Sequence, residues 1–300
     1  MMIENRFPGK DITPEDLLHK FPLAAKRDPA HRTVFSVAGI EFGGQNIPVF
    51  AGPNMVESLE LILDVAEKIQ LAGAHFLRGG AFKPLTFPYR SKKYTETREQ
   101  GIEWLKAAKE KFGIPIITEV MEEKYIPLIA AVSDILQIGS RNMQNFPLLT
   151  ACAKTGRPIM LKRHYGASLR DWLGAAEYIL LEGNSRVILC ERGVSVPHTH
   201  RNTSRFLLDV QVIPAAREIT HLPLVVDPSH ATFWRNWVKP MTLASVAAGA
   251  DGVMIEVHPD PSNSAVDSLQ PINYGDFRAL MIEMDLVARS VGRTVLSKLA

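Results

Sequence analysis

The segment IPVFAGPNMVESLELILDVAEKIQLAGAHFLRG, residues 47–79, contains two short apolar runs separated by a longer amphipathic stretch. The runs IPVFAG and AHFLRG have the composition of parallel strands that are buried on both faces. Between them, ESLELILDVAEKIQLAG has apolar residues at three- and four-residue spacing and stops at Gly73, which is typical of a helix. The segment therefore predicts one strand–helix–strand unit of an α/β fold.

The same unit repeats along the rest of the chain. Further apolar runs are PIITEV, DILQIG, PIMLKR, RVILCE, LPLVVD and DGVMIEV, beginning near residues 115, 134, 158, 186, 222 and 251. Helical patterns fill the gaps, and SLRDWLGAAEYILLEG begins at Ser168 as an N-cap and ends at Gly183. Eight repeats favour a closed (β/α)8 TIM barrel over a doubly wound open sheet, which usually has about five to seven strands.

The first 45 residues fit no such repeat. The segment TVFSVAGIEFGGQNI, residues 33–47, predicts a β-hairpin with a Gly43-Gly44 turn, placed to close the bottom of the barrel. No Ser/Pro-rich linker marks a second domain. We therefore predict an N-terminal extension with a β-hairpin over residues 1–45 and a single catalytic barrel domain over residues 46–300.

Composition excludes several classes of partner. The chain has 34 basic and 32 acidic residues, so its net charge of +2 gives no indication of binding to nucleic acid or to a membrane surface. No signal-peptide core and no apolar segment of roughly 20 residues is present. Cys152 and Cys190 lack the paired spacing of a zinc site or a disulfide framework. We expect a cytoplasmic protein whose two cysteines are core residues.

Polar residues collect where the predicted strands end, which is where TIM barrels place their catalytic groups. Several are cations or amides: Arg78 and Lys83 after the second strand, Gln137 and Arg141 after the fourth, Lys162 and Arg163 at the fifth, and Arg192 after the sixth. Any one cation could instead be a surface residue or an ion-pair partner. Cations from four strand ends together predict a positive pocket for a substrate with several negative charges.

A second group has the residue types that bind a divalent cation. His230 and Glu256 lie at the ends of the seventh and eighth strands, Asp267 follows, and Asn54 ends the first strand, which adjoins the eighth in a closed barrel. An amide oxygen is a weak ligand for transition metals, so Mg²⁺ or Mn²⁺ would suit this set better. The alternative is that His230 and Glu256 form a hydrogen-bonded pair without metal.

These residues lie in motifs that resemble the 3-deoxy-D-arabino-heptulosonate 7-phosphate (DAHP) synthases of the short microbial type, which are related to the 3-deoxy-D-manno-octulosonate 8-phosphate synthases. The likeness runs from about Ile40 to Leu286. It is carried by AGPNMVES, LRGGAFKPLTFPY, DILQIGSRNMQNFPLL, PIMLKR, AAEYILLEGN, VILCERG, RNT, HLPLVVDPSHA and GADGVMIEVHPDP.

The resemblance implies a (β/α)8 barrel that condenses phosphoenolpyruvate with an aldehyde and releases inorganic phosphate. By the same resemblance, Arg141, Lys162 and Arg192 bind the phosphate, while Arg78 and Lys83 flank the carboxylate and the reacting centre. Lys83 is the expected proton donor, and His230 and Glu256 are expected to be catalytic as well as metal-binding. The predicted substrate-binding set is completed by Thr86 and Gln137.

The chain departs from the family pattern at Asn54, where the family normally has a cysteine metal ligand. His230, Glu256 and Asp267 match the other three ligands. The octulosonate branch includes metal-independent enzymes with Asn at this position. We therefore expect no tightly bound cofactor, with a loosely held Mg²⁺ or Mn²⁺ as the remaining option.

A further departure concerns the acceptor. In KPLTFPY the family has Arg where this chain has Leu85, and a small Ser or Thr where it has Phe87; that Arg and the neighbouring Thr bind the phosphate of erythrose 4-phosphate. Ser195 also replaces a basic residue of related enzymes. Without these charge-assisted bonds, erythrose 4-phosphate should bind poorly. Cations at positions 90, 92 and 93 are the nearest substitutes.

We therefore predict a phosphoenolpyruvate-dependent carbon–carbon bond-forming transferase with an altered aldehyde acceptor, serving a specialised pathway and forming homo-oligomers. One alternative is an ordinary DAHP synthase that uses erythrose 4-phosphate in the shikimate pathway to aromatic amino acids. A non-catalytic paralogue that binds phosphoenolpyruvate or a protein partner is another alternative. A Schiff-base aldolase using Lys162 is a third, which the surrounding cations disfavour because they suit anion binding better.

Overall fold

A closed barrel of eight parallel strands forms the centre of the molecule. The computed structural model describes residues 14–85, 95–202, 204 and 206–295. The barrel order is β11-β12-β3-β4-β5-β6-β7-β8. The strands are β3 (Val49–Gly52), β4 (Phe76–Arg78), β5 (Ile116–Glu119), β6 (Ile135–Ile138), β7 (Ile159–Lys162), β8 (Val187–Glu191), β11 (Leu224–Val226) and β12 (Gly252–Glu256). Each lies within its predicted apolar run, so the predicted (β/α)8 barrel is confirmed.

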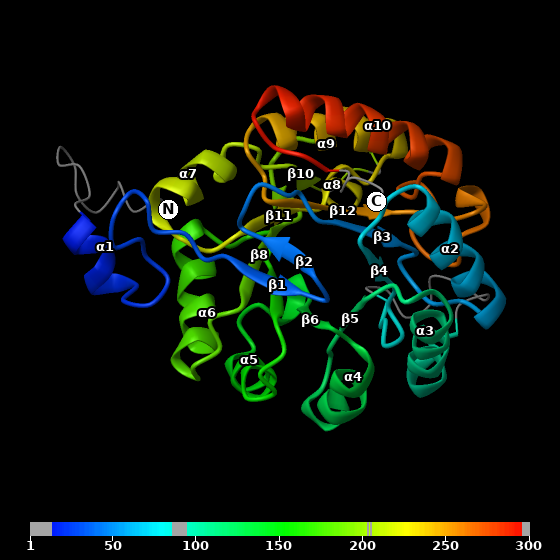
Figure 1. Ribbon diagram of the computed structural model, residues 1–300, viewed down its shortest axis with the longest axis horizontal. Coiled ribbons are helices and arrows are strands. Elements are labelled where there is room, and N and C mark those ends of the chain that lie inside the picture. Colours follow the sequence, from blue (N-terminus) through cyan, green and yellow to red (C-terminus); the bar gives the residue numbers. More distant parts are fainter. Residues whose placement is uncertain (1–13, 86–94, 203, 205, 296–300) are drawn as a thin grey trace.

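Helices surround the barrel (Figure 1). They are α1 (Pro14–Lys20), α2 (Leu59–Leu71), α3 (Arg98–Phe112), α4 (Ile126–Val132), α5 (Phe146–Ala153), α6 (Leu169–Leu181), α7 (Val212–Ile219), α8 (Pro228–Thr232), α9 (Arg235–Ala247) and α10 (Tyr274–Ser290). Short 3-10 turns are η2 (Glu123–Tyr125), η3 (Ser140–Asn142) and η4 (Pro261–Asn263). Ser58 and Ser168 cap α2 and α6 by accepting hydrogen bonds from backbone N–H groups of the first turn.

The N-terminal hairpin is present, but its turn was predicted at the wrong residues. Strand β1 (Phe35–Val37) pairs with β2 (Ile40–Phe42) through a turn at Ala38 and Gly39, both with positive φ, whereas Gly43 and Gly44 follow β2. A two-residue hairpin turn needs positive φ at both central residues, and Ala38 accepts this conformation beside Gly39. The turn was predicted at Gly43-Gly44 because glycine is the usual turn residue.

The hairpin closes the end of the barrel where the strands begin. The Phe42 side chain is fully buried and lies in one cluster with Phe50 and Phe76 from the barrel interior. Its ring centroid is 5.9 Å from that of Phe50 and 5.7 Å from that of Phe76. Among the described residues, this end is filled by apolar side chains, and TIM barrels place their active sites at the opposite end.

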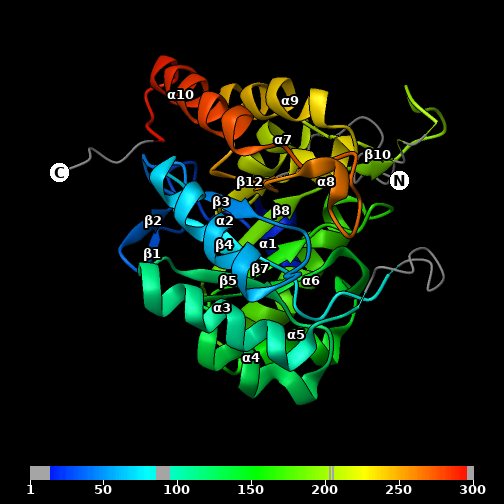
Figure 2. The same cartoon turned by 90° about the vertical axis from the view of Figure 1, so that its right-hand side faces the viewer.

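A two-stranded ribbon stands at that opposite end. Strand β9 (Val194–Ser195) pairs with β10 (Phe206–Leu207), and Figure 2 shows β10 far from β1 and β2. The free cysteines Cys152 and Cys190 are both fully buried, as expected for core residues. No helix in the described ranges is long and apolar enough to cross a membrane.

Candidate active site

The main pocket opens at the carboxyl ends of the barrel strands and encloses about 400 Å³, within the usual size range for small-molecule sites. Its lining contains most of the described residues that were predicted at or after strand ends, but not Asn54, Arg163 or Glu256. The predicted residues that line it are Arg78, Lys83, Gln137, Arg141, Lys162, Arg192, His230 and Asp267. Thr86 lies outside the described residues.

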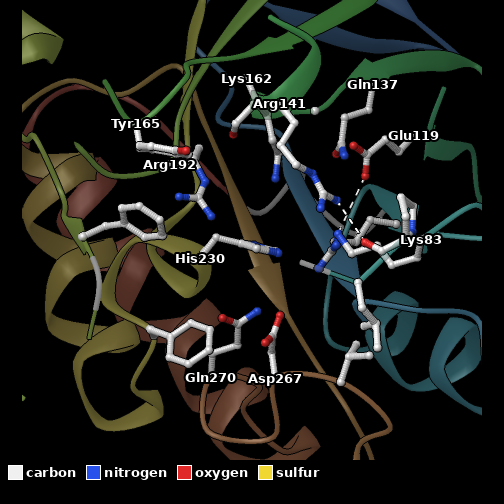
Figure 3. A pocket seen from close by; sticks show the side chains of 18 of the residues that line it. Lys83, Glu119, Gln137, Arg141, Lys162, Tyr165, Arg192, His230, Asp267 and Gln270 are labelled. Atoms are coloured by element: carbon white, nitrogen blue, oxygen red, sulfur yellow. Dashed lines mark hydrogen bonds and ion pairs between the residues drawn. The ribbon is translucent and has the colours of Figure 1, made fainter. Parts of the chain in front are cut away.

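Cations occupy one side of this pocket. In Figure 3, Arg141, Lys162 and Arg192 lie on one side, Asp267 and Gln270 lie on the other, and the His230 ring lies between them. The Arg192 guanidinium stacks on the Phe206 ring at 4.4 Å, and Arg141 donates to the carbonyl of Pro84 at 3.2 Å. These contacts hold two guanidinium groups at the pocket edge, where they can bind an anion.

Lys83 and Glu119 form an ion pair within the cationic side. Lys83 Nζ lies 3.7 Å from Glu119 Oε2. Glu119 fits there because residue 139 is glycine: a Cβ at Gly139 would lie 1.8 Å from Glu119 Oε1. Burial lowers the pKa of Lys83, and the charges of Arg78, Lys162 and Arg141 lower it further, whereas Glu119 opposes the shift. A lysine in this state gives up a proton more readily than an ordinary lysine.

Lys162, Asp227 and His230 form a buried chain of contacts. Lys162 Nζ donates to Asp227 Oδ2 at 2.5 Å, and Asp227 Oδ2 lies 2.8 Å from His230 Nδ1. Burial lowers the pKa of His230 well below its ordinary value, so the ring is neutral. Burial alone raises the pKa of Asp227, but His230, Lys162 and Arg78 together hold it well below its ordinary range. The neutral ring therefore carries its proton on Nδ1, leaving Nε2 as an acceptor.

The predicted metal ligands lie near one another and next to the Arg78 guanidinium. His230 Nε2 is 3.8 Å from Glu256 Oε2, which also accepts a 2.5 Å hydrogen bond from Gln270. Burial raises the pKa of Glu256 to about 8, against the opposing charge of Arg78. Asn54 Nδ2 donates to Asp267 Oδ2 at 3.0 Å, and its Oδ1 accepts from Arg78 at 3.5 Å. Asp267 has a φ of 49°, which is unusual for a non-glycine residue.

This donor set does not fit a tightly held divalent cation. Asn54 presents an N–H donor to Asp267, and the Arg78 guanidinium lies 3.6 Å from Glu256 Oε2, where its charge opposes a second cation. Among the described residues, no three His, Cys, Asp or Glu side chains form a group that could hold a metal ion. The assignment of His230, Glu256 and Asp267 as metal ligands stays a prediction.

The wall beyond the cations is mainly uncharged. Leu85, Ser195, Phe233 and Val266 all line the pocket. The replacement of a family arginine by Leu85 therefore changes the pocket wall itself. Phe87 and the cations at positions 90, 92 and 93 lie outside the described residues.

Two strand-end residues point elsewhere. Arg163 donates to Glu191 Oε2 at 3.0 Å and to Asp209 Oδ2 at 2.8 Å, and does not line the pocket. His258 Nε2 lies 3.3 Å from Glu57 Oε1. Both side chains contact carboxylates outside the pocket, and a strand-end position alone does not distinguish such residues from ligands.

Glu119 and Gln270 are among the lining residues that sequence reasoning missed. Glu119 is the charged residue that ends the apolar run PIITEV, so the strand-end rule applied to the third strand would have found it. Gln270 lies in the long loop after β12, where no periodic pattern marks it.

Comparisons with known proteins agree with this geometry. The family model described as the DAHP synthetase I family matches residues 25–290. A phospho-2-dehydro-3-deoxyheptonate aldolase of Thermotoga maritima is 36% identical over 276 residues, covering 92% of this chain and 80% of the relative. A 2-dehydro-3-deoxyphosphooctonate aldolase of Xylella fastidiosa is 28% identical over 83% of this chain and 95% of its own length.

Solved structures give the same result. The crystal structure of the Thermotoga maritima DAHP synthase superposes with a TM-score of 0.85 at 36% identity, covering 91% of this chain and 78% of that one. A truncated form of the Thermotoga maritima enzyme gives a TM-score of 0.83 at 35% identity, covering 92% of this chain and 99% of that one.

Proposed function

The chain belongs to the DAHP synthetase I family, transferases that form a carbon–carbon bond from phosphoenolpyruvate, and from this premise we propose that its aldehyde acceptor carries no terminal phosphate. The products are inorganic phosphate and a 3-deoxy-2-keto acid. The observation that supports the proposal is that Arg78, Lys83, Arg141, Lys162 and Arg192 line one pocket together with Leu85, which stands where the family has an arginine.

Phosphoenolpyruvate suits the cationic side. Its phosphate would lie against Arg141, Lys162 and Arg192, which come from three neighbouring strand ends. Arg78 is buried and its Nη1 has no hydrogen-bond partner among the described residues, so it can bind the carboxylate. Substrate charge would then be matched by cations already in place.

In the reaction, C3 of phosphoenolpyruvate attacks the aldehyde carbon, and the carbonyl oxygen takes a proton from Lys83. Water adds at C2 and releases a proton, which restores Lys83. The phosphohemiketal then collapses: the C2 hydroxyl gives its proton to the departing phosphate, the bond from C2 to the phosphate oxygen breaks, and a ketone forms at C2. The lowered pKa of Lys83 and its position beside Glu119 support its role as proton donor.

The acceptor proposal follows from the opposite wall. A phosphate brought against Leu85, Phe233 and Val266 would lose water without gaining charge-assisted hydrogen bonds from these residues. Ser195, where related enzymes have a basic residue, adds a hydroxyl but no charge. An aldehyde with an uncharged far end avoids this desolvation cost.

We propose that turnover needs no tightly bound metal. The Asn54 amide and the Arg78 guanidinium occupy the space around Glu256 and Asp267 that a strongly held cation would need. If a loosely held Mg²⁺ or Mn²⁺ binds, His230, Glu256 and Asp267 would hold it, and it would supply Lewis-acid polarisation.

Specific contacts disfavour two alternatives. Lys162 donates to Asp227 at 2.5 Å, which stabilises its ammonium form and opposes Schiff-base chemistry. A non-catalytic paralogue would have little reason to keep the five cations together. We further propose that the protein is cytoplasmic, forms homo-oligomers and works in a specialised pathway.

The test follows phosphate release when the purified protein is incubated with phosphoenolpyruvate and a panel of phosphorylated and unphosphorylated aldehydes. We expect release with unphosphorylated aldehydes. Robust turnover with erythrose 4-phosphate would overturn the acceptor proposal. Phosphoenolpyruvate binding without release for any aldehyde would favour the non-catalytic alternative.

A further inference from the structure

A second chamber adjoins the uncharged side of the main pocket. It encloses about 270 Å³ and shares Leu85, Phe233, Val266 and Asp267 with the main pocket. The rest of its wall is the loop over residues 264–269, which follows β12. The four shared residues form the boundary between the two spaces, so the chamber lies directly beside the main pocket.

Contacts with the rest of the protein fix the chamber wall. Arg235 donates its backbone N–H to the Leu269 carbonyl at 2.8 Å and its guanidinium to the Ser268 carbonyl. At the other end of the loop, the Ala265 N–H donates to Glu57 Oε1 at 3.0 Å. Because both ends of the loop are tied to other elements, the chamber is preformed and needs little ordering when a ligand enters.

The charge of the chamber contrasts with that of the main pocket. Among the described residues that line it there is no Lys or Arg, and the charged group is the carboxyl of Asp267. Arg235 is directed to the Ser268 carbonyl and does not line the chamber. An anionic group here would lose its hydration and face a carboxylate, whereas an uncharged carbon chain would contact Leu85, Phe233 and Val266.

We infer that this chamber receives the far end of the aldehyde acceptor, and that the acceptor is an uncharged aldehyde long enough to reach past Leu85 and Phe233. The inference rests on the proposed condensation. It adds the size and chemical class of the acceptor and identifies the 264–269 loop as a determinant of acceptor length. The aldehyde carbon lies near Lys83, and the remaining carbons pass Leu85 and Phe233 into the chamber.

The experiment measures kcat/KM for unphosphorylated straight-chain aldehydes of two to eight carbons at saturating phosphoenolpyruvate, following phosphate release. Complete burial of a methylene is worth about 0.8 kcal/mol, and Ser264 and Ser268 also line the chamber, so kcat/KM should rise by up to about fourfold per carbon until the chamber is filled. A flat or falling series, with the two-carbon aldehyde turned over normally, overturns the inference and leaves the proposed function standing. Absence of turnover with every unphosphorylated aldehyde overturns both.

A substitution in the chamber tests whether the dependence of kcat/KM on aldehyde length arises there. Ala265→Phe fills the space and should reduce kcat/KM for six- to eight-carbon aldehydes about tenfold or more, while the two-carbon aldehyde changes less than about twofold. Ser262→Phe is the matched control, because it adds the same ring to an exposed position of η4. Equal losses for short and long aldehydes in Ala265→Phe would assign the loop a structural role and overturn the inference.

Discussion

The two sides of the pocket differ in what they keep of the family pattern. On one side, Arg78, Lys83, Arg141, Lys162 and Arg192 come from four strand ends and surround a space suited to a phosphate and a carboxylate. Close to these cations, three positions depart from the family pattern: Leu85 stands in place of an arginine, Ser195 in place of a basic residue and Asn54 in place of a cysteine. One barrel thus combines a retained donor site with an altered acceptor site.

The difference teaches how specificity can change without loss of the shared chemistry. Two of the donor cations, Arg78 and Lys162, lie on barrel strands, where side-chain direction is set by the strand register, whereas Leu85 lies in the loop after β4. A substitution in a loop such as Leu85 alters the wall without moving the strand ends. Fold and donor site can therefore persist while the acceptor changes.

The largest effect is expected at the donor cations. Arg192→Ala should lower kcat/KM for phosphoenolpyruvate about 10³-fold, because it removes a preorganised cation from the leaving phosphate. Arg170→Ala on the exposed surface of α6 is the matched control and should leave the rate unchanged. The readout is phosphate release, with thermal unfolding to confirm folding. A loss below about tenfold would show that the phosphate is held elsewhere.

Lys83 should control the alkaline side of the pH profile. It must be protonated to donate, so kcat/KM should fall as the pH rises through its pKa, which lies below the ordinary lysine value of 10.5. Lys83→Met should reduce kcat about 10²-fold, and Lys83→Arg should move the alkaline limb to higher pH. An unchanged alkaline limb in Lys83→Arg would remove this lysine from the proton transfer.

The role of residue 85 in acceptor binding can be tested by restoring the positive charge that the family has there. Leu85→Arg should raise kcat/KM for erythrose 4-phosphate by about tenfold or more, because a charge-assisted hydrogen bond contributes about 1.5–3 kcal/mol. Leu85→Met keeps the volume and should have no such effect. Equal behaviour of the two variants, measured by phosphate release, would place the acceptor's far end away from residue 85.

The smallest effect is expected from chelation. Removal of divalent cations with EDTA should change the rate of the unmodified enzyme less than about twofold, because the Asn54 amide gives the site a weak ligand. Asn54→Cys should bind Zn²⁺ or Mn²⁺ more tightly and make activity sensitive to the chelator. Loss of activity on chelation of the unmodified enzyme, reversed by Mg²⁺ or Mn²⁺, would refute metal independence.

Repetition made the fold predictable from sequence. Each strand is short and apolar on both faces, and each helix has a periodic apolar pattern with a cap such as Ser58 or Ser168. The hairpin turn was predicted at the wrong residues because both Gly43-Gly44 and Ala38-Gly39 have the composition of a turn. The pairing of Phe35 with Phe42 places the turn at Ala38-Gly39. That pairing depends on packing against the barrel interior, which local sequence does not show.

The candidate site was predictable to the extent that its residues end strands. The strand-end rule found Lys162 and Arg192, but it could not separate them from Arg163, which turns toward Glu191 and Asp209. The Lys83–Glu119 pair depends on space left by Gly139, and the second chamber depends on how residues 264–269 fold back. Such features arise from contacts between distant segments, so no local pattern reveals them.

The most direct test of the altered acceptor compares D-erythrose with D-erythrose 4-phosphate, which differ only in the phosphate. Both are supplied with phosphoenolpyruvate to the unmodified enzyme, and kcat/KM is measured from phosphate release. The account predicts that the unphosphorylated sugar is the better acceptor, by about tenfold or more. A preference for erythrose 4-phosphate would contradict it and identify the chain as an ordinary DAHP synthase.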